Sequence, residues 1–102
     1  MKYILVKMAL PIRRDNGMRV PDVPDSAFAM CEQAQMQYDD KYCFVFAIIK
    51  DTIDVEAVAS QLPITPYNYD GDEFKAITEI MQNECDYMNG VKERPVPNAS
   101  LG

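Results

Sequence analysis

The stretch YCFVFAIIK, Tyr42–Lys50, decides the expected fold of this chain. It is rich in aromatic and β-branched residues, which favour β-strands. Its apolar side chains occupy both sets of alternating positions, and a strand that is apolar on both faces is covered on both sides. We therefore predict a central strand here and arrange the other elements around it.

A second such strand is predicted over Tyr3–Leu10, where apolar residues again fall on both faces. It leads into Asn16-Gly17, a pair that tolerates positive φ and is a strong signal for a two-residue turn. We expect a β-hairpin with its tip near Asp15–Gly17. The second arm, MRVP (Met18–Pro21), is short and ends in proline, which is typical of an edge strand.

Three helices are predicted from helical spacing of apolar residues. The first covers about 25–38, where Pro24 and Asp25 are start signals, although Asp39 and Asp40 suit a helix C-terminus poorly. The second covers about 54–62 and the third about 72–88. The apolar positions on which these three predictions rest are Ala27, Cys31, Ala34 and Tyr38 in the first helix, Val55, Val58, Ala59 and Leu62 in the second, and Phe74, Ile77, Ile80, Met81, Cys85 and Met88 in the third.

These elements predict an α+β fold in a small single domain, with an N-terminal β-hairpin and a central strand packed against about three helices. The chain has 102 residues, which suits one domain with one core. Residues 1–90 should form that domain, and the proline-containing segment 91–102 is expected to be a flexible tail. The sequence leaves open whether the two central strands run parallel or antiparallel.

The net charge of −6 conceals an uneven distribution along the chain. Residues 1–20 hold five basic residues and one acidic residue, whereas residues 21–90 hold 14 acidic and three basic residues. Such asymmetry bears on partners and association rates. No apolar run approaches the roughly 18 residues of a membrane span, and the N-terminus lacks the order of a signal peptide. We expect a cytoplasmic protein that does not enter membranes.

Little in the sequence predicts catalysis or a cofactor. The chain has no histidine and three widely spaced cysteines, so the usual zinc ligand sets and histidine-activated nucleophiles are missing. No glycine-rich phosphate-binding motif occurs. We expect no enzyme activity, no cofactor, no bound metal and three reduced, buried cysteines.

The stretch PYNYDGDEF, Pro66–Phe74, is the strongest candidate for a site. Aligned as a calcium loop on Gly71, it lacks the first and the last ligand. Asp70 and Glu73 instead match a capping box for the following helix. The two tyrosines have two interpretations: they pack down as a plug, or they form an exposed binding surface with the acids. The predicted binding residues are Tyr67, Tyr69, Asp70, Asp72, Glu73 and, on the helix, Glu79.

Two function classes remain. The first is a small acidic, non-catalytic protein that docks on a basic partner such as a nucleic-acid-binding protein. It would be comparable in charge and size to the nucleic-acid mimics and anti-CRISPR inhibitors of phages and mobile elements. The second is an assembly module that forms homodimers through the MRVP edge or an apolar helix face. Arg13, Arg14 and Arg19 could contact phosphate or serve as counter-charges, but the acidic composition argues against direct nucleic-acid binding.

Overall fold

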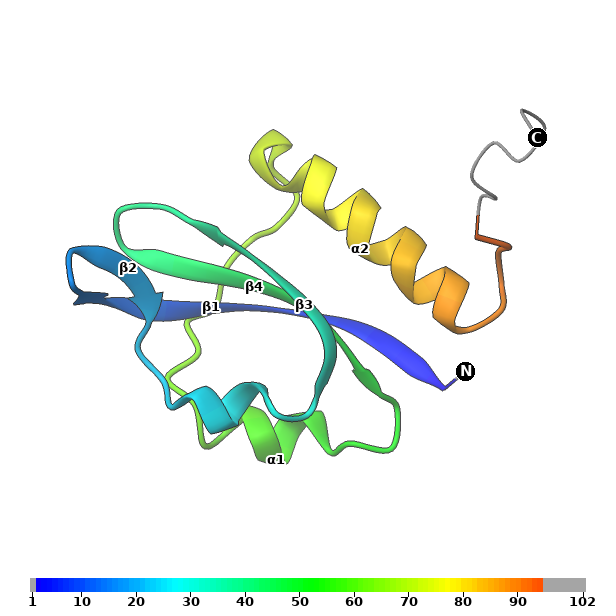
Figure 1. Ribbon diagram of the computed structural model, residues 1–102, viewed down its shortest axis with the longest axis horizontal. Coiled ribbons are helices and arrows are strands. Elements are labelled where there is room, and N and C mark those ends of the chain that lie inside the picture. Colours follow the sequence, from blue (N-terminus) through cyan, green and yellow to red (C-terminus); the bar gives the residue numbers. More distant parts are fainter. Residues whose placement is uncertain (1, 95–102) are drawn as a thin grey trace.

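A computed structural model describes residues 2–94 and shows a four-stranded antiparallel sheet in the order β2-β1-β4-β3. The sheet is curled, with α2 across one face and two short helical segments on the other (Figure 1). The strands are β1 (Tyr3–Asp15), β2 (Met18–Pro21), β3 (Cys31–Tyr38) and β4 (Tyr42–Lys50). The helical elements are the 3-10 turns η1 (Asp25–Phe28) and η2 (Asp72–Phe74) and the α-helices α1 (Val55–Ala59) and α2 (Lys75–Met88).

The two strands predicted to be central neighbours are confirmed as neighbours. β1 and β4 pair antiparallel from Tyr3 opposite Lys50 to Pro11 opposite Tyr42. The predicted hairpin is also present, since Asn16 and Gly17 have φ values of 52° and 81°, as its two-residue turn requires. β2 stands at one end of the strand order, so MRVP is an edge strand as expected.

The predicted fold, a hairpin and a central strand packed against about three helices, is wrong. The segment predicted as a helix over 25–38 is mostly strand. Only Asp25–Phe28 is helical, and Cys31–Tyr38 forms β3 against β4. The apolar residues Ala34 and Tyr38 fit both spacings, since four residues make one helical turn and also two strand repeats. The decisive signal was the alternation of Ala34, Met36 and Tyr38 with glutamines at 33, 35 and 37.

The expectation of about three helices is also wrong. α1 has five residues, whereas η2 continues into the 14-residue α2, which is the one long helix among residues 2–94. Asp54 caps α1, because its side chain accepts a hydrogen bond from the Ala57 amide at 3.1 Å. No helix of the described chain is long and apolar enough to cross a membrane.

β4 separates two hydrophobic layers. Phe44, Phe46 and Ile48 face α2 and pack with its buried residues Ile77, Met81 and Cys85, together with Phe74 and Ala9. The opposite set is smaller: Cys43, Val45 and Ala47 pack with Leu10 and Val23 under η1 and α1. All six of these β4 side chains are at most 2% exposed, so the strand is covered on both faces, as its composition predicts.

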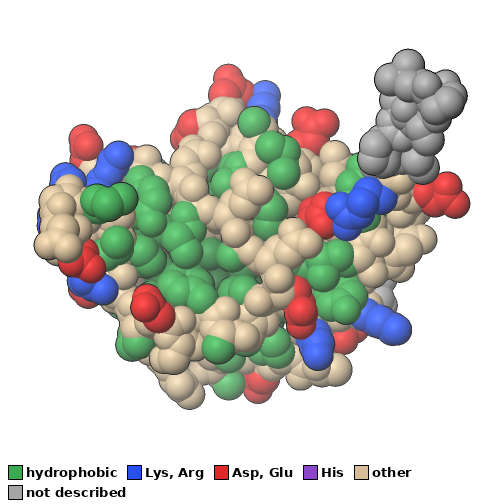
Figure 2. Space-filling model, in the orientation of Figure 1, with side chains coloured by type: hydrophobic (Ala, Val, Ile, Leu, Met, Phe, Trp, Pro, Cys, Tyr) green, Lys and Arg blue, Asp and Glu red, His purple; other side chains and the backbone are tan. Residues whose placement is uncertain are grey.

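The small side chains on the second face leave a cavity of about 170 Å³. It lies between the curled sheet and the segments around η1 and α1, with Val6, Met8 and Leu10 of β1 on one side and Val58 and Leu62 on the other. Figure 2 shows hydrophobic side chains around a hollow between the sheet and these short helices. The cavity follows from the size difference between the two faces of β4, because bulky rings fill only the α2 side.

Asn89 joins the first strand to the end of the last helix. Its side-chain oxygen accepts hydrogen bonds from the amides of Lys2 and Tyr3 at 3.1 and 2.9 Å, and its side-chain nitrogen donates to the Tyr3 carbonyl at 2.9 Å. Tyr3 lies on the outer edge of β1, so the Asn89 amide takes the place of a neighbouring strand. The predicted tail covers residues 91–102. Of these, residues 95–102 lie outside the described part of the chain.

We predict that Asn89→Ala lowers the free energy of unfolding by about 1–3 kcal/mol, because it leaves partly buried backbone groups of Tyr3 without partners. In a domain of this size, that corresponds to a fall in Tm of at least about 4 °C. Thermal unfolding followed by circular dichroism measures it. The control is Gln82→Ala, which removes an exposed bond to Asp86 on the same helix and should change stability by less than about 0.5 kcal/mol. Equal Tm values for the two variants would contradict the role assigned to Asn89.

Candidate functional site

The loop that carries Tyr67 and Tyr69 crosses the edge of the sheet. It leaves α1 on one face and passes β1, where the Thr65 amide donates to the Ala9 carbonyl at 2.9 Å. It then reaches the other face, on which α2 lies. Pro63 and Pro66 favour an extended backbone in this passage. The loop therefore brings both tyrosines onto the phenylalanines of β4.

Tyr69 packs into the core. Its ring centroid lies 5.3 Å from that of Phe74, 5.8 Å from Phe46 and 6.3 Å from Phe44. Burial, with a smaller contribution from Tyr67, raises the pKa of Tyr69 to about 12. Of the two interpretations left open by the sequence, Tyr69 fits the first, because its ring packs down into the core as a plug.

Tyr67 behaves differently, because 41% of its surface is exposed. Its ring still stacks on the core, with its centroid 4.7 Å from Phe44, and it meets Tyr42 at 5.9 Å. Packing on one side holds the ring in place while the other side faces solvent. A fixed, exposed aromatic ring of this kind offers contact area at a low cost in conformational entropy.

Three of the predicted acids lie in the same short segment as this ring, which itself contacts Phe74 at the end of η2. Asp70, Asp72 and Glu73 are all exposed, and Asp72 forms an ion pair with Lys75 at 2.7 Å. The predicted capping box is absent: Gly71, not Asp70, precedes η2, and no side-chain cap bond forms there. The carboxylate of Glu73 instead folds back against Gly71, at the place where a Cβ would stand. Figure 2 shows acidic side chains along the upper edge of the molecule, above η2 and the start of α2.

The turn between β3 and β4 adds residues that the sequence analysis did not assign to a site. Gln37 donates to the Glu73 carbonyl at 2.9 Å, and Tyr42 packs against Tyr67, so this turn lies beside the Pro66–Phe74 segment. Asp39 is used inside the turn, where it accepts bonds from the amides of residues 41 and 42 at 2.7 Å. Asp40 is exposed. The missed signal was the poor fit of Asp39-Asp40 to a helix end, since the pair forms a hairpin turn.

We call this group the Tyr67 surface. It consists of the exposed or partly exposed residues Asp40, Tyr42, Tyr67, Asp70, Asp72 and Glu73. Glu79, the sixth predicted binding residue, is exposed on α2 but lies seven residues, or roughly 10 Å along the helix axis, beyond Asp72. It borders the Tyr67 surface rather than joining it.

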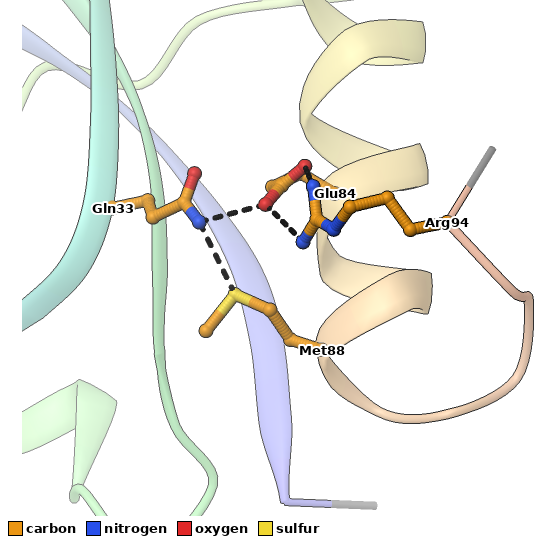
Figure 3. Close-up of polar contacts among 4 residues, drawn as sticks. All are labelled: Gln33, Glu84, Met88 and Arg94. Carbon is orange, nitrogen blue, oxygen red and sulfur yellow. Dashed lines mark hydrogen bonds and ion pairs between the residues drawn. The ribbon is translucent and has the colours of Figure 1, made fainter. Parts of the chain in front are cut away.

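Other acids near the end of α2 serve the fold itself. Glu84 forms a two-bond ion pair with Arg94, both bonds at 2.7 Å, and accepts from Gln33 of β3 at 2.8 Å (Figure 3). The bonds from Arg94 and then from Gln33 hold the pKa of Glu84 below its ordinary value. Asp86 pairs with Lys92 at 3.6 Å. Both acids are half-buried and paired, so they do not contribute to a free acidic surface.

The arginines of the hairpin contact groups of the chain itself. Arg13 lies 3.9 Å from the carboxylates of Asp15 and Asp22. Arg14 donates to the Gly17 carbonyl at 3.2 Å, and Arg19 donates to the Asp39 carbonyl at 3.0 Å with its guanidinium above the ring of Tyr38. Arg13 therefore acts as a counter-charge, one of the two roles left open for this cluster, while the bonds of Arg14 and Arg19 within residues 2–94 go to backbone oxygens.

The three cysteines and most of the apolar face of α2 lie in the two hydrophobic layers of the fold. Cys43 and Cys85 are buried on opposite sides of the sheet, and Cys31 is half-buried beside the cavity. Burial raises the pKa of the Cys31 and Cys43 thiols, which lowers their thiolate fraction at neutral pH. Within residues 2–94, no three potential metal-ligating side chains lie together. Of the apolar helix face considered for dimerisation, Ile77, Met81 and Cys85 pack on the chain's own sheet, whereas Ile80 is 54% exposed.

We predict that Tyr69 makes the fold sensitive to alkali. Its pKa of about 12 in the folded state lies above the ordinary value of 10, so the folded state keeps a proton that the unfolded state releases. This contribution to stability is complete below pH 10 and is lost as the pH rises to about 12. Tyr69→Phe should flatten the decline in Tm between pH 10 and pH 12 relative to wild type, measured by circular dichroism. Tyr67→Phe is the control. A decline that is unchanged in Tyr69→Phe would show that this ring ionises freely.

The chain was compared with known proteins, and no protein-family model, curated protein or solved structure matches it. Its function must therefore be inferred from the placement of its own side chains. The clearest feature for that purpose is the exposed ring of Tyr67 with the acids beside it.

Proposed function

We propose that the protein is a small acidic, non-catalytic binding protein that docks on a basic protein surface through the Tyr67 surface. The observation that carries this proposal is the position of Tyr67, which is stacked on Phe44 at 4.7 Å and yet 41% exposed. Aromatic anchors that are held rigidly before binding dominate the energetics of many interfaces. Tyr67 combines such an anchor with exposed acidic residues in the same segment.

The charges around Tyr67 support a basic partner. Asp40, Asp70 and Glu73 are exposed, and the only acid of the group with an ion pair in the described chain is Asp72. Exposed pairs of this kind contribute little individually, about 0.2–1 kcal/mol. Together they accelerate the encounter with an oppositely charged surface and exclude acidic ones. The nucleic-acid-binding site of another protein is basic, because it normally contacts phosphates. We therefore propose that the acids of the Tyr67 surface imitate those phosphates.

The contacts of the hairpin arginines support the choice of the acidic surface over the basic hairpin. Arg13 is shared between two carboxylates of the chain, and Arg19 rests on Tyr38. A partner approaching Arg13 would compete with its existing ion pairs. The acids of the Tyr67 surface have fewer competitors within the chain, so they are more available to a partner.

We predict that Tyr67→Ala weakens partner binding by about 2 kcal/mol or more, roughly thirtyfold in Kd, because it removes the anchor. Partners are first captured from cells of the source organism on the immobilised wild-type protein and identified by mass spectrometry. Biolayer interferometry then measures the Kd of each captured partner for wild type and variant. Tyr67→Phe is the matched control and should retain most of the affinity, since the ring remains.

We also predict that the double change Asp72→Lys and Glu73→Lys slows association more than it speeds dissociation, because these charges act on the encounter. Raising the salt concentration from 0.05 to about 0.5 M should weaken wild-type binding, since the Debye length falls several-fold. Glu56→Lys is the control, because Glu56 is an exposed acid on α1, on the other face of the sheet. The proposal fails if Arg13→Ala with Arg14→Ala abolishes binding while the Tyr67 and acidic variants bind normally.

A further inference from the structure

An apolar stripe runs along the face of β1 that is turned away from α2. Val6, Met8, Leu10 and Ile12 alternate with residues of the other face, and all four pack in the hydrophobic layer under η1 and α1. The stripe borders the cavity of about 170 Å³, whose lining is apolar apart from Lys7. A cavity of about 150 Å³ lined by aliphatic and aromatic side chains stays free of water and accepts a molecule such as benzene. The space can therefore hold an apolar group.

The stripe ends at two arginines. Arg14 is the next residue of the same alternating set, and Arg19 stands directly opposite it in the β1–β2 ladder, so both side chains share the face of the stripe. Arg19 lies with its guanidinium 5.8 Å from the centre of the Tyr38 ring, and Tyr38 packs against the same apolar layer. Positive charge and apolar surface are thus adjacent on this face.

Neither arginine is neutralised within residues 2–94. The ion pairs of this part of the chain involve Arg13 and Arg94 but not Arg14 or Arg19, whose bonds go to the backbone oxygens of Gly17 and Asp39. Each guanidinium has five N–H donors, so donors remain for an anion. Two like charges directly opposite on a sheet repel each other, and a shared carboxylate would relieve that repulsion.

We propose that this face binds a free medium-chain fatty acid, with its carboxylate between Arg14 and Arg19 and its alkyl chain running along the apolar stripe toward the cavity. From Leu10, at the cavity, to Arg14 is four residues of strand, or about 13 Å. The bound molecule must therefore be an elongated amphiphile rather than a compact one. The arginines supply two-donor geometry for a carboxylate. This site lies across the sheet from Phe44, on which Tyr67 stacks, so it is independent of the proposed docking function.

Isothermal titration of the full chain with decanoate, below its micelle concentration, tests the proposal. Decanoate should bind at least about tenfold more tightly than 1-decanol, which has the same chain and no charge. The double variant Arg14→Gln with Arg19→Gln should lose that preference and leave decanol binding unchanged. Arg13→Gln, on the other face of the same hairpin, is the matched control and should bind decanoate like wild type.

A second pair of variants tests the cavity. Ala59→Leu fills it and should weaken both decanoate and decanol, whereas Ala57→Leu on the exposed side of the same helix should weaken neither. Ala27→Val, which also narrows the cavity, serves if Ala59→Leu does not fold by circular dichroism. The proposal is overturned if decanoate gives no binding, or if it binds no better than decanol and ignores the arginine change. It is also overturned if the chain binds anionic phospholipid vesicles but not free decanoate, since that indicates a membrane surface.

Discussion

The burial of β4 on both faces is the constraint on which the rest of the structure depends. A strand with Phe44, Phe46 and Ile48 on one side and Cys43, Val45 and Ala47 on the other requires two coverings, and the chain provides a different one for each. The bulky side takes α2, whose regular helix packs against large rings. The face with the smaller side chains is covered by the curled edge of the sheet and by short helical segments, which leave a cavity unfilled. The two candidate sites follow from this difference between the two faces.

How far the sequence predicts this fold depends on the range over which each signal acts. Asn16-Gly17 and the two-sided apolar strands are decided by the residues themselves, so the hairpin and the β1–β4 neighbours could be predicted. β3 is signalled less clearly, because Ala34 and Tyr38 fit both periodicities and only the alternation of Ala34, Met36 and Tyr38 with glutamines distinguishes the strand from a helix. Its conformation is imposed by pairing with β4, and such tertiary pairing overrides weak local preference.

The candidate site was predicted to a similar extent. Tyr67 and its acids lie in one contiguous segment, so the sequence identifies them as candidates, but it leaves open whether the Tyr67 ring is exposed. The different fates of Tyr67 and Tyr69 depend on how a loop crosses the sheet edge at Thr65, which the sequence does not reveal. Asp40 and Tyr42 belong to the Tyr67 surface because β3 is a strand that turns into β4 beside it. Since β3 was predicted as a helix, these two residues were missed. The Arg14–Arg19 pair likewise depends on strand register.

The amide of Asn89 also constrains the order in which the fold can be completed. It bridges residues separated by 86 positions, while β3 and β4 are joined by a turn of three residues and can pair early. On the ribosome, β1 is made before β4 and α2, so it must wait for β4 and then for the last turn of α2 before its outer edge at Tyr3 is closed. Until then the growing chain carries an open, apolar strand, and such edges are the usual starting points of aggregation. The residue that completes the native edge is thus synthesised only after all four strands of the sheet.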